Sequence, residues 1–238
     1  MGGCHSYISS SSRDGDTASK AEEFSDITGH NLKNNNTQAA PSLEEKPYLM
    51  QDYVSERIAD IDIKTLSVLP DGFDKAEWMA SHTIAFFKHI NMLSSALSDF
   101  CTTRTCPTTT GPGDVTYYWT DEHGKKLKCS APLYTDYTMS YIQELLTDEE
   151  VFPTHTAGSS FPNGFVFLVQ RIFLYLFHAL AHLYWAHFRD VVRMEMHPHL
   201  NTLFAHLVTF SREFQLLEPA ETAPMEDLIS TLCLHHSS

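Results

Sequence analysis

Apolar residues recur at helical spacing in several segments of the chain, and prolines or polar runs separate these segments. Asp74 is suited to cap a helix over residues 75–97, in which apolar side chains repeat three and four residues apart. The same pattern predicts four further helices, over residues 134–146, 165–188, 199–214 and 221–233. Pro198 and Pro219 mark the breaks before the last two of these. The pattern therefore predicts a mainly α-helical fold.

One short region has the composition of β-structure. Residues 115–119 are rich in Val, Thr, Tyr and Trp, residues 121–124 form a turn, and residues 126–130 return as a second strand. Residues 101–114 are dense in Thr, Pro and Gly and are predicted to be a loop. We expect one small β-hairpin beside the helices.

The most apolar helix, over residues 165–188, is long enough to suggest a membrane span. Gln170, Arg171 and three histidines interrupt it, and ionisable groups are costly in lipid. We therefore interpret this segment as a core helix.

The start of the chain has a different composition. Residues 1–46 are rich in Ser, Thr, Asn, Asp and Gly, so we expect a disordered tail followed by one folded domain over residues 47–238. The opening MGGCHS fits the N-myristoylation pattern, in which Gly2 is acylated after Met removal. Cys4 is a candidate for palmitoylation, because a second acyl chain would make a membrane anchor stable.

The formal net charge of -14 limits the expected partners. Residues 1–46 carry four basic and seven acidic side chains, so about -11 remains on the folded domain. An acidic surface repels nucleic acid and anionic lipid and favours basic protein partners. Five cysteines in a chain without a recognisable secretory signal indicate a reducing compartment.

Two cysteines and three histidines form a candidate metal site. Cys101 and Cys106 are a C-x4-C pair in the predicted loop, and His178, His182 and His187 lie on one predicted helix. Two thiolates and two imidazoles can fill a tetrahedral zinc site. On an ideal helix, positions four apart share a face, whereas positions five apart diverge by about 140°. Geometry alone therefore favours His178 with His182, and His187 reaches the metal only if the helix loosens near its end. The alternative is that all three histidines are ordinary core or capping residues.

An ordered series of short segments between residues 48 and 233 resembles the Mob kinase-activator (Mob/phocein) family. In chain order these are LP at 69–70, EW at 77–78, FFKHIN at 86–91, FC at 100–101 with Cys106, YWTD at 118–121, CSAP at 129–132, DEEVFP at 148–153, AHLY at 181–184, HF at 187–188, HLNT at 199–202 and REF at 212–214.

The resemblance implies a Mob-type helical bundle with a small β-hairpin and one structural zinc, whose ligands match Cys101, Cys106, His182 and His187. Four protein ligands leave no open position, so such a site stabilises rather than catalyses. A zinc hydrolase needs an open position and a general base, as in H-E-x-x-H, but residues 183–186 are Leu, Tyr, Trp and Ala. We therefore expect a non-enzyme.

Residues 177–188 are most similar to the second metazoan subfamily, which the resemblance associates with NDR-family kinases. The first subfamily reads phosphothreonine peptides with three basic side chains. Those positions are Leu174, Tyr175 and His178 here, which puts phosphopeptide docking in doubt, because phosphate requires Arg or Lys donors. An acidic residue that favours LATS-type partners is replaced by Ala85.

The resemblance also implies that the partner is a basic, helical N-terminal segment of the kinase, and the acidic domain has the complementary charge. Glu77 is the candidate to pair with kinase Arg or Lys, unless it belongs only to a solvated helix face. Trp78 is a second candidate, although a Trp in a first helical turn more often packs inward. We expect an adaptor that modulates an NDR-family serine/threonine kinase; the alternative is a membrane-tethered scaffold without direct kinase control. The expected location is the cytoplasm, with the plasma membrane and nucleus as further candidates.

Overall fold

The computed structural model describes residues 46–153 and 160–234, all within the compact unit Glu44–Ser238. The predicted tail, with Gly2 and Cys4, lies outside the described residues. The described helices are α1 (Gln51–Val54), α2 (Ile63–Ser67), α3 (Lys75–Ala96), α4 (Ala131–Thr147), α5 (Phe165–Ala186), α6 (Phe188–Arg193), α7 (His197–Phe214), α8 (Pro219–Thr222) and α9 (Glu226–Leu234). The described residues also contain three 3-10 helices, η1 (Pro47–Leu49), η2 (Pro112–Asp114) and η3 (Ala223–Met225). The strands are β1 (Thr110–Gly111), β2 (Val115–Thr116), β3 (Trp119–Thr120) and β4 (Lys126–Leu127), and η2 connects β1 to β2.

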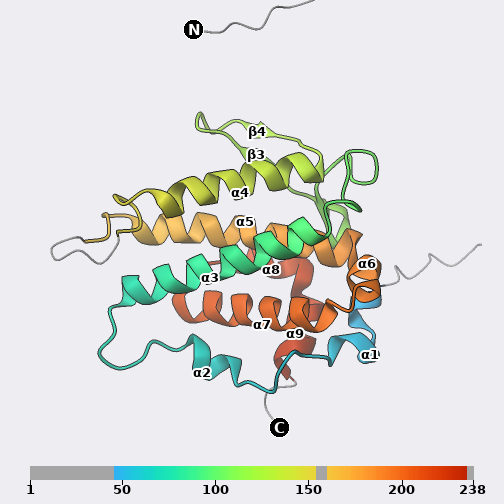
Figure 1. The fold of residues 1–238 in the computed structure, drawn as a ribbon, viewed down its shortest axis with the longest axis horizontal. Helices are drawn as coiled ribbons and strands as arrows, with labels where there is room; N and C mark the ends of the chain where they lie inside the picture. Colours follow the sequence, from blue (N-terminus) through green and yellow to red (C-terminus); the bar gives the residue numbers. More distant parts are fainter. Residues whose placement is uncertain (1–45, 154–159, 235–238) are drawn as a thin grey trace, which may run out of the picture. The chain divides into compact units, whose positions relative to one another are not determined.

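The α5 helix is the centre of this bundle. It packs against α3, α4, α6 and α7, and Figure 1 shows α3, α4, α5 and α7 stacked side by side. By length and apolar composition α5 could cross a membrane, but 61% of its most apolar window is buried inside the fold. Its apolar residues are therefore accounted for by neighbouring helices, in agreement with the interpretation as a core helix.

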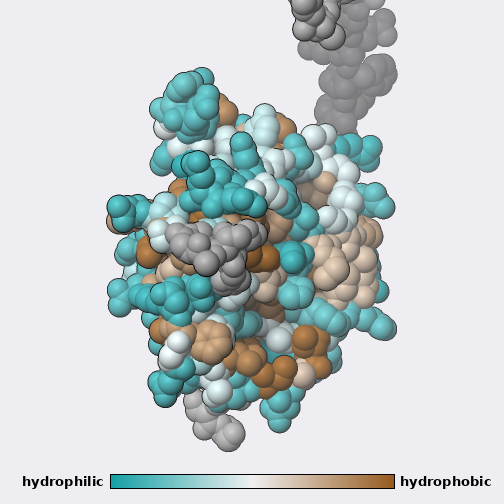
Figure 2. Space-filling model, turned by 60° about the vertical axis from the view of Figure 1, so that its left-hand side comes forward, coloured by the Kyte–Doolittle hydropathy of each residue, from teal (hydrophilic) through white to brown (hydrophobic). Residues whose placement is uncertain are grey.

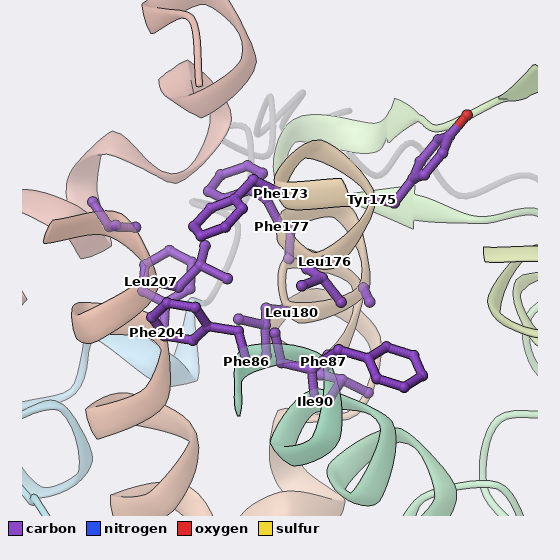
Figure 3. Close-up of a cluster of buried hydrophobic side chains, with 14 of the residues drawn as sticks. Phe86, Phe87, Ile90, Phe173, Tyr175, Leu176, Phe177, Leu180, Phe204 and Leu207 are labelled. Atoms are coloured by element: carbon purple, nitrogen blue, oxygen red, sulfur yellow. The ribbon is translucent and has the colours of Figure 1, made fainter. Parts of the chain in front are cut away.

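The core consists of large side chains that three of these helices direct toward one another. Phe86 and Ile90 of α3, Phe173 and Phe177 of α5 and Phe204 of α7 are each at most 2% exposed. Figure 3 shows these rings meeting between the helices. Burial of such a side chain stabilises the fold by about 1.5–3 kcal/mol, so the helical spacing of apolar residues determines how the bundle assembles.

The predicted start of α3 is confirmed. The Asp74 carboxylate accepts hydrogen bonds from the backbone N–H groups of Ala76 and Glu77, at 2.9 and 3.0 Å, which satisfies two donors that a helix start leaves without partners.

Three other helix limits differ from the prediction because of proline. Pro132 and Pro198 occupy the first turns of α4 and α7, so these helices begin before the predicted residues 134 and 199. Proline is tolerated there because its missing N–H would have no helical partner. Pro224 lies within η3 and separates α8 from α9, so the single helix predicted over residues 221–233 is wrong.

The β-structure also differs from the prediction. The expected hairpin exists, since Trp119 pairs with Leu127 and Thr120 with Lys126. The predicted single strand over residues 115–119 is wrong, because β2 pairs instead with β1, inside the segment expected to be a loop. The chain reverses between these strands at η2, where Gly113 and Asp114 have φ values of 70° and 56°.

Candidate functional site

Four side chains from two distant parts of the chain converge at one end of α5. Cys101 follows α3 and donates its backbone N–H to Leu97 O at 3.0 Å. The carbonyl oxygen of Cys106 accepts the N–H of Ala131 at 3.0 Å, which ties the loop to the start of α4. His182 lies in the last turns of α5, and His187 lies at the junction between α5 and α6.

The backbone at His187 explains how two histidines five residues apart reach one place. α5 ends at Ala186, and His187 has φ −126° and ψ 10°, outside the helical region. α6 then starts at Phe188. This break removes the angular divergence that a continuous helix would impose. The predicted helix over residues 165–188 is therefore two residues too long, and the break occurs at a candidate metal ligand.

The four donor atoms have the spacing of a metal site. They all lie within 4.8 Å of one another. Cys101 Sγ is 3.6 Å from His182 Nε2, and Cys106 Sγ is 3.3 Å from His187 Nε2. A tetrahedral ion with metal–sulfur and metal–nitrogen bonds of about 2.3 and 2.0 Å separates neighbouring donors by roughly 3.5 Å. These four residues can therefore hold one metal ion without a large rearrangement.

Backbone and carboxylate oxygens orient both imidazoles. The Nδ1 atom of His182 donates to Thr110 O at 2.8 Å, and the Nδ1 atom of His187 lies 3.5 Å from Asp190 Oδ2. Because each Nδ1 faces an acceptor, each Nε2 directs its lone pair toward the thiols. Metal-binding histidines usually have such outer partners. The sequence analysis identified neither Thr110 nor Asp190, although an acidic residue three positions after His187 is a signal that could have indicated the second.

Burial shifts the pKa of both histidines in the direction that suits a bound cation and shifts that of Cys101 in the opposite direction. Burial lowers the pKa of His182 to about 4 and lowers that of His187, so both imidazoles are neutral at pH 7. Burial and the nearby Cys106 raise the pKa of the Cys101 thiol to about 12 in the absence of a metal. A bound dication reverses the effect on the thiol, because it stabilises the thiolate directly.

His178 does not belong to this group, and the expectation from ideal helix geometry is wrong for it. Its Nδ1 shares a hydrogen bond of 2.7 Å with the Tyr134 hydroxyl, and its ring stacks on Tyr117 at 3.9 Å. Burial lowers its pKa to about 3, so His178 is neutral at pH 7. It packs on the side of α5 that faces α4 and the β1–β2 region.

Leu174 and Tyr175 are the other two positions at which the first subfamily has basic side chains. Together with His178 they border an open groove of about 590 Å³ between α5, the β3–β4 hairpin and α8. Leu174 is apolar, and Tyr175 is only 4% exposed. The adjacent Arg171 donates to Thr120 O at 3.1 Å and to the Tyr175 hydroxyl at 3.2 Å. The groove therefore contains a guanidinium that is already engaged by groups of this chain.

The candidate kinase-binding residues lie in the first turn of α3. Glu77 is exposed, and Trp78 is half-buried against the core. The Trp78 ring lies 4.3 Å from His82 and 5.9 Å from Phe73, and its Nε1–H points to Ser67 O at 3.4 Å. Phe73, which the sequence analysis did not identify, is 59% exposed beside it. Ala85 is exposed further along α3.

Comparison with known proteins identifies the family. The model of the Mob1/phocein family matches residues 55–225. MOB kinase activator 2 of Mus musculus is 51% identical over 194 residues, which cover 81% of this chain and 82% of that protein. The Homo sapiens protein of the same name is 51% identical and covers 81% of each. MOB kinase activator-like 2 of Drosophila melanogaster is 43% identical over 187 residues, which cover 79% of this chain and 33% of that protein. The chain therefore belongs to the Mob1/phocein family.

Proposed function

We propose that this chain is a non-catalytic adaptor that binds the basic N-terminal regulatory segment of an NDR-family serine/threonine kinase and modulates its activity. The names of its relatives at 51% identity support a role in kinase regulation. The observation that carries the proposal is a mixed acidic and apolar surface at the start of α3.

This α3-start surface combines apolar and acidic exposed side chains, and the exposed Lys75 between them directs its Nζ over the Phe214 ring. Its apolar members are Leu66, Val68 and Phe73, which are 45%, 43% and 59% exposed. Its acidic members are Asp71 and Glu77, both exposed. In Figure 2 hydrophobic residues gather low on the visible face, at the height where α2 and its connection to α3 lie in Figure 1.

Trp78 supports this surface from below. Its edge-to-face contact with Phe73 and its hydrogen bond to Ser67 O connect the exposed ring to the end of α2. An exposed aromatic side chain held by a second ring loses less conformational entropy when a partner covers it. We therefore propose that Phe73 contacts the kinase segment directly, and that Trp78 both supports Phe73 and contacts the segment.

An amphipathic basic helix matches this arrangement. Such a helix presents apolar residues on one face, and Lys or Arg at the edges of that face. The apolar residues would cover Leu66, Val68 and Phe73, while the basic residues would approach Glu77 and Asp71. The formal net charge of -14 attracts a basic partner over a longer range and excludes nucleic acid from the proposed partners.

The metal in this proposal is zinc with a structural role. Two thiolates and two imidazoles are a preferred zinc donor set, and four protein ligands complete a tetrahedron. No coordination position would then remain for a water molecule or a substrate, so the site would lack the means of metal-assisted hydrolysis. When bound, the ion would join the Cys101–Cys106 loop to the end of α5.

We also propose that phosphopeptides are not the ligands of the α5 groove. Leu174 has no charge, His178 is neutral because of its low pKa, and Arg171 is engaged by Thr120 and Tyr175. The exposed Lys126 also lines the groove, but it shares the lining with the carboxylates of Asp121, Glu122 and Glu221, which repel phosphate. Phosphate recognition relies on accessible, charged donors.

Reversing one charge tests the kinase-binding proposal. Glu77→Lys is expected to weaken binding of a basic NDR-kinase N-terminal peptide by about tenfold, which corresponds to about 1.4 kcal/mol. Calorimetric titration at low and moderate salt measures the affinity. Glu144→Lys, an equal charge reversal on the exposed face of α4, is the matched control and should change affinity little. Equal affinities for the Glu77 variant and the unmodified protein would refute the proposed surface.

A second candidate function is a membrane-tethered scaffold without direct kinase control. The opening MGGCHS motif supports it, with Gly2 and Cys4 as the acylated residues and the plasma membrane as the location. The tether by itself is compatible with kinase binding, whereas a scaffold without direct kinase control is not, and the peptide titration separates that scaffold from the adaptor.

A further inference from the structure

A cavity of about 240 Å³ lies between α3, α4 and α5 and reaches the metal-binding group. Ser94 and Ser98 line it on one side, and Pro132 and Asp136 of α4 line it on the other. This volume is several times the roughly 30 Å³ that one water molecule occupies in the liquid. The cavity is open to solvent and therefore admits small polar molecules.

The cavity reaches the four candidate ligands unequally. Cys101 and His182 line it, whereas Cys106 and His187 do not. Cys106 is 7% exposed and His187 is 3% exposed, while Cys101 has intermediate exposure. Of the two sulfur atoms, Sγ of Cys101 is therefore the one that a solute in the cavity can contact.

We propose that Cys101 is an oxidation site through which hydroperoxides release the metal. The Cys101 thiolate attacks one peroxide oxygen, the O–O bond breaks, and hydroxide or alkoxide leaves. The sulfur loses two electrons to become a sulfenic acid, and the peroxide gains them. Sγ of Cys106, within 4.8 Å, then attacks the sulfenic sulfur. The S–S bond forms, hydroxide leaves and takes up a proton as water, and both thiolate ligands are lost.

The proposed oxidation changes the attachment of the Cys101–Cys106 loop and does not act on the α3-start surface. A Cys101–Cys106 disulfide leaves only the two imidazoles of the donor set, so the loop is no longer joined to α5 by the ion. Reduction by a dithiol restores both thiolates and permits metal rebinding. This inference goes beyond the proposed kinase adaptor role and depends only on the metal site.

The test uses the full chain loaded with one equivalent of zinc and treated with hydrogen peroxide. Isotope-coded alkylation after denaturation, read by mass spectrometry, gives the oxidation rate of each cysteine, and a chromophoric chelator records zinc release. We expect Cys101 to be oxidised together with zinc release, a Cys101–Cys106 disulfide to form, and dithiothreitol to restore both. Oxidation of Cys129 before Cys101, or zinc release without loss of the Cys101 thiol, would overturn the proposal.

A cavity-filling variant tests the route. Ser94→Leu adds apolar bulk to the cavity wall and should slow Cys101 oxidation by at least about fivefold, because access controls thiol reactivity. Ser140→Leu adds the same side chain to an exposed position of α4 outside the cavity and should leave the rate unchanged. Equal rates in a zinc-loaded Ser94→Leu protein would refute the cavity as the route.

If Ser94→Leu fails to fold, tert-butyl hydroperoxide on the unmodified chain replaces it. Compared with hydrogen peroxide, the bulkier reagent should react more slowly with Cys101 by a larger factor than with a small free thiol. An equal factor for the two thiols would also refute the route. Binding of a kinase peptide is measured separately on reduced, zinc-loaded protein. Failure of the adaptor proposal and failure of the oxidation proposal therefore give different results.

Discussion

The backbone conformation of His187 decides which histidines join the candidate metal site. In a continuous helix His182 would pair with a residue four positions away, and His178 is the one available on the N-terminal side. Instead the chain leaves the helical region at His187, and the Nδ1 atom of this residue faces Asp190. The position of one carboxylate therefore contributes to the orientation of one ligand.

Replacing Asp190 tests this orientation. Asp190→Ala removes the acceptor near His187 Nδ1 and should lower zinc affinity by about 10–100-fold. Asp190→Asn retains an oxygen acceptor, so its zinc affinity should fall less than that of Asp190→Ala. Competition with a chromophoric chelator measures the affinity. Arg193→Ala is the control, because Arg193 donates to Asp190 Oδ1 at 2.9 Å, whereas His187 Nδ1 lies near the other oxygen, Oδ2. A loss of affinity in the Arg193 variant as large as that in Asp190→Ala would contradict the orienting role.

At the scale of secondary-structure elements, the candidate metal joins a loop to the end of the central helix. The loop begins at the end of α3, pairs β1 with β2, and reaches the start of α4 through the Cys106–Ala131 hydrogen bond. The ion would connect this segment to α5 and α6. Its contribution to stability should therefore be large compared with that of a surface contact.

Removing the metal tests that contribution. Cys101→Ala and His182→Ala should each abolish stoichiometric zinc binding, measured by atomic absorption. A loss of about 4 kcal/mol would lower the melting temperature by about 8–16 °C. His178→Gln should retain zinc, because His178 contacts Tyr134 and Tyr117 instead. A chelator should lower the melting temperature of His178→Gln but not that of His182→Ala. Zinc binding by the His182 variant would refute the ligand assignment.

The α3–α7 interface predicts an effect of pH on stability. Burial lowers the pKa of His206 to about 4, below the ordinary value of 6.5, and no partner within the described residues satisfies its Nε2 atom. Below about pH 6.5 the unfolded chain binds a proton that the folded chain does not. The folded state therefore loses stability as pH falls from 6.5 toward 4.

Urea unfolding at pH 7.5 and 5.5 measures this loss. His206→Phe should reduce the slope with pH by at most about 1.4 kcal/mol per pH unit, because one fewer proton is bound on unfolding. His123→Phe, at an exposed position of the β3–β4 turn, is the matched control for the substitution itself. An identical slope in the His206 variant would show that this residue does not titrate on unfolding.

At the scale of the whole molecule, the net charge favours some partners over others, and the proposed tether would add a second influence. A formal net charge of -14 repels anionic lipid, so membrane association requires an attractive term other than charge. The proposed acylation at Gly2 would supply such a term, and one myristoyl chain alone binds membranes only marginally. The proposed second chain at Cys4 would make the association stable.

Membrane fractionation of cells tests the tether. Gly2→Ala should move the full chain from the membrane fraction to the cytosol, because the acyl acceptor is lost. Gly3→Ala alters the neighbouring glycine and leaves the acceptor in place, so its distribution should match that of the unmodified chain. An unchanged distribution for Gly2→Ala would exclude myristoylation as the anchor.

The amino-acid sequence alone determined the helical class, the Asp74 cap, the core helix α5 and the set of residues from which the candidate metal ligands come. These features depend on local spacing and on donor chemistry, which are readable along the chain. The family resemblance already implied His187 rather than His178, and the tertiary structure supplied the backbone break that brings His187 to the group. Only the tertiary structure divided the C-terminal helix at η3, paired β1 with β2 and placed Phe73 beside Trp78. Each of these depends on contacts between segments far apart in the chain or on a local departure from ideal backbone geometry, and neither leaves a periodic signal in the sequence.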